Sequence, residues 1–256
     1  MRMDMFDLSG KVALITGGSR GLGRRIATAY AEHGADIVVA SRKQDNCEDL
    51  AELLRTEFGV KAWGIGANVS HWSQCDSLVE GAYTLAGKVD ILVNNAGLSP
   101  TYDSISEVTE GLYDKTLDVN LKGPFRLSAT IGARMATAGS GSIINVSSTE
   151  SLYPTAHALP YAMAKAALNT LTLGLVQAYS PAVRVNTIVP GPFKTDIAHA
   201  WEPTTFQSIA EATIAMSRAG EPEEVVGAAL YFASNSSSYT TGAMLRVDGG
   251  VFGAFR

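Results

Sequence analysis

Short apolar runs alternate along the chain with longer segments of helical periodicity. Runs such as Ile37-Val38-Val39 and Ile91-Leu92-Val93 are apolar at every position, as strands are when helices cover both faces of a parallel sheet. The alternation is typical of βαβ units with right-handed crossovers, so we predict an α/β fold with a doubly wound, Rossmann-type parallel sheet. The seven predicted strands are Val12–Thr16, Asp36–Ala40, Ala62–Ala67, Ile91–Asn94, Ser142–Val146, Arg184–Val189 and Ala243–Val247.

The chain gives no sign of a second domain. No repeat, low-complexity tract or linker divides it, and α/β folds of about this length often form one domain, so we expect a single domain over 1–256. Residues 190–218 break the regular alternation, beginning with Pro190-Gly191-Pro192 and carrying Trp201 and Phe206. A long insertion at the carboxyl ends of the strands is typical of a substrate lid.

Composition narrows the class of partner. The net charge is −5, and the lysines and arginines are dispersed, so we expect a small molecule rather than nucleic acid or an anionic membrane. The N-terminus is too acidic and too weakly apolar for a secretion signal, and no apolar run is long enough to cross a bilayer, which favours a cytoplasmic location. Cys47 and Cys75 do not make a disulfide framework or a metal-ligand pattern, so no metal is expected.

A glycine-rich turn follows the first predicted strand. Gly17, Gly21 and Gly23 permit a tight turn in which backbone amides approach a pyrophosphate, while the next helix presents its positive N-terminus. The spacing departs from the G-x-G-x-x-G fingerprint, so the position of the turn between strand and helix carries the prediction of a dinucleotide site.

The end of the second predicted strand indicates which dinucleotide binds. An NAD site needs an acidic side chain there, but the strand ends in Ser41-Arg42 and no carboxylate occurs before Asp45. A hydroxyl and a guanidinium suit the 2′-phosphate of NADP, and Arg20 could reach the same phosphate. The alternative is that Arg42 and Lys43 form a solvated start to the following helix.

Tyr161 and Lys165 are candidates for acid–base chemistry. Residues four apart lie on one face of a helix, and Pro160 suits its first turn. A nearby ammonium favours the phenolate, so we expect Lys165 to bring the pKa of Tyr161 toward the neutral range. Ser148 lies thirteen residues before Tyr161, while its neighbour Ser147 is expected to be a turn or cap residue.

These motifs, taken in order, resemble those of the short-chain dehydrogenase/reductase family in its single-domain form. The resemblance covers nearly the whole chain. Among members of the family, the chain resembles 3-oxoacyl-acyl-carrier-protein reductases and gluconate 5-dehydrogenase-like enzymes. The matching segments are Thr16 to Gly23, Asn94-Asn95-Ala96-Gly97, Asn120, Ser148, Tyr161 to Lys165, Pro190-Gly191, Thr195 and Val247-Asp248-Gly249-Gly250. Asn68-Val69 departs from the family's usual Asp-Val, which makes an adenine contact of Asn68 less certain.

The resemblance implies a role for each catalytic candidate. Tyr161 would be the general acid and base, Ser148 would hydrogen-bond the substrate oxygen, and Lys165 would hold the nicotinamide ribose. Asn120 would position a water that links Lys165 to solvent. The residues expected to bind NADP(H) are Gly17, Ser19, Arg20, Gly21, Leu22, Gly23, Ser41, Arg42, Asn68, Val69, Asn95, Ala96, Gly97, Tyr161, Lys165, Pro190, Gly191, Phe193 and Thr195.

The substrate is expected above the carboxyl ends of the strands. Its predicted pocket residues are Leu98, Glu150, Tyr153, Trp201 and Phe206, with Pro100, Tyr102 and Phe193 adding to the apolar lining. Glu150 either hydrogen-bonds a polar substrate or is turned to solvent or caps a turn, and His157 is expected to be a loop residue.

The sequence therefore predicts an NADP(H)-dependent oxidoreductase that interconverts a ketone and a secondary alcohol. Its substrate is either a 3-oxoacyl thioester or a keto sugar acid or polyol. The alternative is a non-catalytic NADP(H)-binding sensor or assembly protein on the same fold, against which the complete catalytic set argues. The resemblance also implies a homotetramer.

Overall fold

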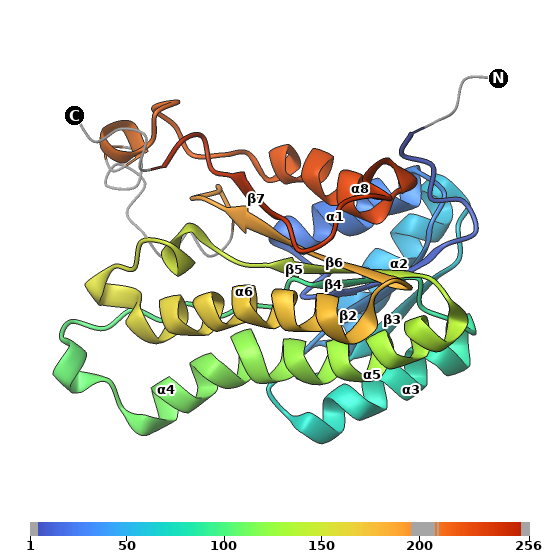
Figure 1. Ribbon diagram of the computed structural model, residues 1–256, viewed down its shortest axis with the longest axis horizontal. Coiled ribbons are helices and arrows are strands. Elements are labelled where there is room, and N and C mark those ends of the chain that lie inside the picture. Colours follow the sequence, from blue (N-terminus) through green and yellow to red (C-terminus); the bar gives the residue numbers. More distant parts are fainter. Residues whose placement is uncertain (1–4, 196–207, 209, 252–256) are drawn as a thin grey trace.

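A seven-stranded parallel sheet forms the centre of the protein, in the order β3-β2-β1-β4-β5-β6-β7 (Figure 1). The computed structural model describes residues 5–195, 208 and 210–251. Every predicted strand is found, with each end within one residue of its predicted position. The strands are β1 (Val12–Thr16), β2 (Asp36–Ser41), β3 (Ala62–Gly66), β4 (Ile91–Asn94), β5 (Gly141–Val146), β6 (Val183–Pro190) and β7 (Met244–Val247).

Helices cover both faces of this sheet, which confirms the predicted doubly wound fold (Figure 1). One face carries α1 (Gly21–Glu32), α2 (Gln44–Phe58) and α8 (Val226–Ala233). The other carries α3 (Trp72–Ala86), α5 (Gly123–Ala138) and α6 (Leu159–Tyr179). The helix α4 (Glu110–Leu117) continues into α5 through a π-helical turn, η2 (Asp118–Lys122), and the short 3-10 turns are η1 (Ile105–Glu107), η3 (Thr149–Ser151), η4 (Ala156–Ala158), η6 (Pro222–Val225) and η7 (Asn235–Ser237).

The first strand shows why its residues are apolar throughout. Side chains alternate between the two faces of a strand, and here Ala13 and Ile15 pack in the cluster with α1, α2 and α8. Val12 and Leu14 pack in the other cluster, with α3 and α5. Both sets are buried, so a polar residue at any of these positions would have to enter a core.

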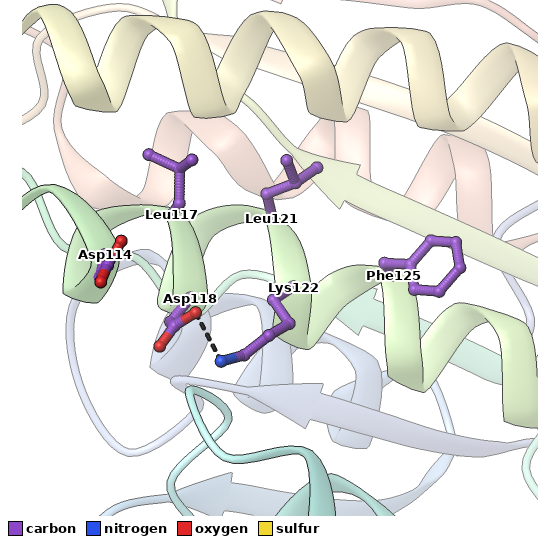
Figure 2. A pocket seen from close by; sticks show the side chains of 6 residues that line it. All are labelled: Asp114, Leu117, Asp118, Leu121, Lys122 and Phe125. Carbon is purple, nitrogen blue, oxygen red and sulfur yellow. Dashed lines mark ion pairs between the residues drawn. The ribbon is translucent and has the colours of Figure 1, made fainter.

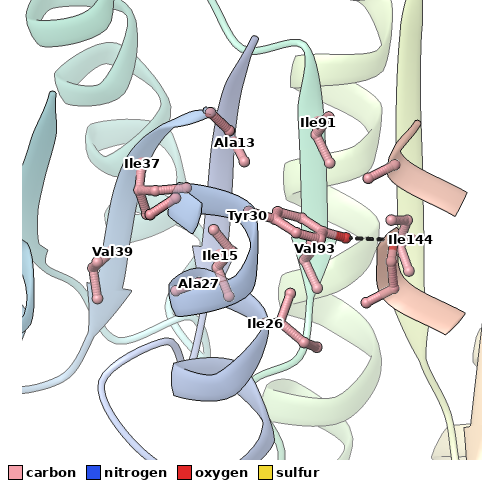
Figure 3. Packing of buried hydrophobic residues seen from close by; sticks show 14 of the residues in the cluster. Ala13, Ile15, Ile26, Ala27, Tyr30, Ile37, Val39, Ile91, Val93 and Ile144 are labelled. Atoms are coloured by element: carbon pink, nitrogen blue, oxygen red, sulfur yellow. Dashed lines mark hydrogen bonds between the residues drawn. The ribbon is translucent and has the colours of Figure 1, made fainter. Parts of the chain in front are cut away.

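Tyr30 joins two helices that are distant in the sequence. Its ring is fully buried in the cluster that contains Ile26 and Ile144, and its hydroxyl donates a hydrogen bond to the carbonyl of Ala229 at 2.8 Å (Figure 3). This bond ties α1 to α8, so the chain beyond β6 is attached to the first βαβ unit.

A buried polar network crosses the centre of the sheet. The amide nitrogen of Asn94 donates to Asn145 and to Ser128, each at 2.9 Å. Asn145 in turn donates to the hydroxyl of Thr172 at 2.9 Å, and that hydroxyl lies 2.8 Å from the hydroxyl of Thr187. The network joins β4, β5 and β6 to α5 and α6, so Asn94 has a structural role.

The strand order creates one edge where several loops meet. The chain passes from β3 across the sheet to β4 on the far side of β1, and ligands of doubly wound sheets bind at the carboxyl ends beside such a reversal. Thr16, Asn94 and Val146 end their strands at this edge. Among the described residues, no helix is long and apolar enough to cross a membrane, and no cluster of His, Cys, Asp and Glu could hold a metal ion.

Candidate active site

The first two turns of α6 bring Tyr161 and Lys165 together at the carboxyl end of β5. Pro160 lies in the first turn, as predicted. The ammonium nitrogen of Lys165 lies 5.6 Å from the centroid of the Tyr161 ring, so both side chains are on one face of the helix.

Lys165 is buried and fixed by the strand beneath it. Only 2% of the residue is exposed, and its Nζ donates a hydrogen bond of 2.8 Å to the carbonyl of Val146. Burial lowers the pKa of Lys165 to about 7, because the charged ammonium loses its hydration. The amine can therefore gain or lose a proton near neutral pH.

The pKa of Tyr161 moves in the direction opposite to the expectation. Burial raises it to about 12, a hydrogen bond with the side chain of Ser148 lowers it in part, and the charge of Glu150 raises it. The expected lowering by Lys165 is wrong for this arrangement. Loss of water around the phenol outweighs the other influences, and burial also disfavours the ammonium that was to lower the pKa.

Of the two serines after β5, Ser148 lies beside Tyr161 as predicted, but it, rather than Ser147, is the capping residue. Ser148 is the cap of η3, since its hydroxyl accepts a hydrogen bond from the amide of Glu150 at 3.2 Å, and it also bonds to Tyr161. Ser147 is buried, and its hydroxyl donates to the carbonyl of Lys165 at 3.2 Å. Ser147 therefore fixes α6 to the end of β5, and the capping serine is the one beside Tyr161.

Asn120 meets the same site from the π-helical turn. Its amide nitrogen donates to the carbonyl of Leu98 at 2.7 Å, and its oxygen accepts from the Leu98 amide at 3.3 Å. A Cβ atom added at Gly97 would lie 3.2 Å from the oxygen of Asn120 and 3.8 Å from Nζ of Lys165. Asn120 and Lys165 thus face the same small space at Gly97, and the four catalytic candidates lie together.

The glycine turn is packed too closely to accept side chains. Gly17 has φ of 62° and Gly21 has φ of 52°, in the left-handed region that favours glycine. A Cβ atom at Gly23 would lie 2.3 Å from the carbonyl oxygen of Gly17. Asn95 holds the turn from β4, since its amide nitrogen donates to Thr16 and Gly17 at 3.0 and 3.2 Å.

This turn has the features of an anion cradle. Helix α1 begins beside it with no acidic residue in its first turn and no side-chain cap, so its first amides are available to an anion. A Cβ atom at Gly21 would lie 3.7 Å from Thr195, which places that threonine at the turn. The residues present therefore fit the pyrophosphate of a dinucleotide.

The end of β2 lies beside the same turn. The hydroxyl of Ser19 donates to that of Ser41 at 3.0 Å, and the amide of Gly18 donates to the carbonyl of Ala40 at 3.2 Å. Arg20 and Arg42 are exposed, and neither guanidinium has a carboxylate partner among the described residues. The paired hydroxyls of Ser19 and Ser41 are thus each followed in the chain by an exposed arginine, a set of residues that fits a phosphate.

Asn68 and Val69, which were expected to contact the adenine, lie between β3 and α3. The side-chain oxygen of Asn68 accepts from the amide and hydroxyl of Ser70 at 3.2 and 2.9 Å, so it stabilises the turn before α3. Val69 is buried, and its carbonyl lies 2.4 Å from where a Cβ atom at Gly123 would be. The adenine contacts of both residues stay predictions.

The pocket residues are distributed differently from the prediction. Phe193 is 7% exposed, and its ring packs in the core, 2.7 Å from where a Cβ atom at Gly220 would lie. Its ring therefore does not line a pocket, and a coenzyme contact could involve only its backbone. Leu98 is half-buried beside Asn120, and Tyr153 is exposed. Trp201 and Phe206 lie outside the described residues, as does all of 196–207 within the proposed lid at 190–218.

Glu150 has partners within its own loop. Its carboxylate accepts hydrogen bonds from the amide of Thr155 at 2.8 Å and from the Thr155 hydroxyl at 3.2 Å. These contacts match the alternative in which Glu150 caps a turn. His157 is exposed in η4.

Two polar side chains beside the site have functions that the sequence did not reveal. The Thr16 hydroxyl accepts from the amides of Asn95 and Ala96, each at 3.1 Å, and so aligns the segment after β4. The Tyr102 hydroxyl accepts from the amide of Leu159 at 2.9 Å. Thr16 was visible only as a motif residue. For α6, the N-cap residue Ala158 has no side chain that can accept a hydrogen bond. This was the one sign in the sequence that the helix needs a capping partner from a distant segment.

A surface depression lies apart from these residues, over α4, η2 and α5 (Figure 2). Asp118 and Lys122, which form an ion pair of 2.5 Å, are among its lining residues, and no predicted site residue contributes to it. Its lining residues are Asp114, Leu117, Asp118, Leu121, Lys122 and Phe125.

The parallel sheet and the glycine cradle, with the tyrosine–lysine pair at the same edge, define a Rossmann-type fold of the class that binds dinucleotides. A family model described as Enoyl-(Acyl carrier protein) reductase matches residues 17–252. Dehydrogenase/reductase SDR family member 4 of Homo sapiens is 37% identical over 245 residues, covering 95% of this chain and 88% of the human protein. The chain belongs to the short-chain dehydrogenase/reductase family of oxidoreductases, which use nicotinamide coenzymes.

Two solved structures illustrate the match. A 3-oxoacyl (acyl-carrier-protein) reductase from Agrobacterium tumefaciens with NADP bound has a TM-score of 0.92 and 30% identity, with 98% of each chain covered. L-sorbose reductase from Gluconobacter frateurii, complexed with NADPH and L-sorbose, has a TM-score of 0.90 and 30% identity, covering 97% of this chain and 98% of the reductase.

Proposed function

We propose that the protein is an NADP(H)-dependent oxidoreductase that interconverts a ketone and a secondary alcohol. The observation that carries the proposal is the hydrogen bond between Tyr161 and Ser148, beside Lys165 and at the same sheet edge as the glycine cradle. Two hydroxyls at one point can bind one carbonyl oxygen and deliver a proton to it.

The nicotinamide supplies the hydride in reduction and accepts it in oxidation. Tyr161 gives its phenolic proton to the carbonyl oxygen in reduction and removes it in oxidation. Ser148 donates a hydrogen bond to the same oxygen and fixes its position, which lowers the barrier by orientation.

Lys165 and Asn120 complete the proposed proton path. A pKa of about 7 lets Lys165 exchange protons near neutrality, and it would also hold the nicotinamide ribose. Asn120 faces the same space at Gly97, which supports its proposed part in placing a water between Lys165 and solvent.

The preference for NADP(H) rests on the end of β2. Arg20 and Arg42 stand near the paired hydroxyls of Ser19 and Ser41, and neither guanidinium has a carboxylate partner within the described ranges. A 2′-phosphate would satisfy these cations, whereas the 2′-hydroxyl of NAD would not. Both solved relatives named above carry NADP or NADPH, which supports the same choice.

Of the two substrate classes, a keto sugar or polyol has one observation in its favour. A carrier protein that delivers an acyl thioester would dock on a basic patch, and Arg126 and Arg134 are the candidates near the central helix. Arg126 is paired with Asp76 at 2.5 Å, and Arg134 is paired with Glu80. Because both cations are neutralised, we favour a small, freely diffusing hydroxyketone over a carrier-bound substrate.

The test is the initial rate of NADPH oxidation, with NADH in parallel, on a keto sugar acid, L-sorbose and a 3-oxoacyl thioester. We expect turnover of a hydroxyketone by the wild-type protein and none by Tyr161→Phe, which should still bind NADPH. Near-normal rates in Tyr161→Phe would exclude the tyrosine mechanism. NADPH binding without turnover of any ketone would support the non-catalytic alternative.

We also propose a homotetramer in the cytoplasm. Phe125 on α5, and Met163 and Leu173 on α6, are about half exposed, at 46%, 47% and 50%, and a second copy packed on these helices would bury them. Light scattering during size exclusion should give four times the mass of 27.0 kDa. A monomeric mass would refute the assembly.

A further inference from the structure

Helix α6 begins without a capping side chain of its own. Its N-cap residue is Ala158, and no side chain of the cap accepts a hydrogen bond from the first turn. The first four amides of a helix have no partner within it. The proposed acid, Tyr161, lies in this turn. Any movement of the first turn would therefore also move the phenol of Tyr161.

Tyr102 supplies the missing partner from another part of the chain. Its hydroxyl accepts a hydrogen bond of 2.9 Å from the amide of Leu159, the first residue of α6, although the two are 57 residues apart. Tyr102 is half-buried in the segment between β4 and η1. Because no other side chain in the described part of the chain caps this end, the phenol is well placed to fix the direction in which α6 starts.

The segment that carries Tyr102 is itself anchored beside the acid–base centre. Its earlier part is tied to Asn120, which exchanges two hydrogen bonds with the backbone of Leu98. Residues 98–102 therefore join the π-helical turn to the start of α6. A displacement at either end would change the distance between Tyr161 and the groups around Gly97.

We propose that Tyr102 is a positioning residue, whose hydroxyl holds the first turn of α6 so that Tyr161 meets Ser148 and the substrate oxygen. This role differs from the apolar lining expected from the sequence. The positioning role rests on the proposed function, because loss of the Tyr102 hydroxyl lowers kcat only if Tyr161 transfers the proton.

The test compares Tyr102→Phe with Tyr179→Phe. Both keep the aromatic ring and remove one hydrogen bond between a phenol and the backbone, since the Tyr179 hydroxyl donates to the Ala129 carbonyl at 2.8 Å from the opposite end of α6. In Tyr102→Phe we expect kcat to fall by about 3- to 30-fold, as small misplacements of reacting groups do. NADPH affinity should stay within about twofold of wild type, because the substitution removes no contact at the glycine turn or at the end of β2. Tyr179→Phe should keep the wild-type kcat.

Amide hydrogen exchange gives a second measurement that does not depend on turnover. The peptide over residues 157–164 should exchange faster in Tyr102→Phe and at the wild-type rate in Tyr179→Phe. Unchanged exchange in Tyr102→Phe overturns the inference, and so does an equal loss of kcat in the two variants. If Tyr161→Phe is inactive while Tyr102→Phe keeps its kcat, only the positioning role fails. If Tyr161→Phe is active, the proposed function fails, and the exchange measurement still decides whether Tyr102 holds the helix.

Discussion

Lys165 shows how burial can make one side chain responsive to pH. In water its pKa would be 10.5, and in the fold it is about 7. Between these values the unfolded chain binds a proton that the folded chain does not. The free energy of unfolding should therefore rise as the pH increases from about 7 toward 10.

Replacing Lys165 tests this dependence. In Lys165→Met the unfolding free energy of the coenzyme-free protein should lose a pH slope of up to about 1.4 kcal/mol per pH unit between pH 7 and 9. The same substitution at the exposed Lys61 is the control and should keep the slope. Urea denaturation at several pH values measures both. Parallel curves for wild type and Lys165→Met would contradict the assignment.

Arg42 carries the prediction of coenzyme choice. In Arg42→Asp the ratio of kcat/KM for NADPH over NADH should fall by at least about tenfold, because a charge-assisted contact with the 2′-phosphate becomes a repulsion. Lys43→Asp makes the same change of charge one residue later and should shift the ratio much less. Equal shifts in both variants would indicate a general field and support the reading of Arg42 and Lys43 as a solvated helix start.

The position of a single residue was predictable where a sequence motif determines it. It was less predictable where packing or hydrogen-bond partners determine what the side chain does. The spacing of Tyr161 and Lys165 was sufficient to place both on one face. Phe193 is apolar like a pocket residue, and only the packing of its ring on Gly220 shows that it belongs to the core. Glu150 accepts hydrogen bonds from Thr155 in its own loop. The residue type alone does not show whether a glutamate will bind a loop residue or a ligand.

At the scale of elements, the glycine turn and α1 act as one unit. Gly23→Ala would place a methyl group 2.3 Å from the carbonyl of Gly17 and 2.4 Å from the amide of Asn95. The turn must widen, so we expect NADPH affinity to fall by more than about tenfold and stability by about 1–3 kcal/mol. Gly111→Ala in α4, where an added Cβ meets nothing within 4 Å, should leave both nearly unchanged. Fluorescence titration and thermal unfolding measure the two effects, and unaltered NADPH binding by Gly23→Ala would refute the cradle.

The strands were predictable because short apolar runs alternate along the chain with segments of helical periodicity, as in a parallel sheet that helices cover on both faces. The π-helical turn η2 was not, since one additional residue within a helix leaves no mark in the apolar pattern. The partner that caps α6 was also hidden, because a contact between Tyr102 and Leu159 depends on how two distant segments come together.

At the scale of the whole molecule, the Asn94–Asn145–Thr172–Thr187 network connects the middle of the sheet to α6. Asn145→Leu would keep much of the volume but leave the amide of Asn94 with one partner fewer and remove the hydrogen bond that Asn145 donates to the hydroxyl of Thr172. We expect a loss of about 2 kcal/mol or more, measured by urea unfolding. Tyr30→Phe, which removes a single bond to Ala229, should cost about 1 kcal/mol. Equal losses would show that the contacts of Asn145 contribute no more than the single bond of Tyr30.

The overall architecture followed from the sequence because alternating strands and helices permit few arrangements once crossovers are right-handed. The carboxyl-end location of the site followed from the same rule. The polar network did not, since asparagine and threonine within a strand give no indication of which partners they will meet across the sheet.

The π-helical turn makes the number of residues in this region a constraint in itself. Deleting one residue from Asp118–Lys122 would remove the π-helical turn, restore a regular helix there and shift the position of Asn120 on it. Asn120 would then leave Leu98, and the segment that reaches Tyr102 would lose its anchor. Substitutions can vary the chemistry of this helix, but a change of length by a single residue would disconnect it from the reaction.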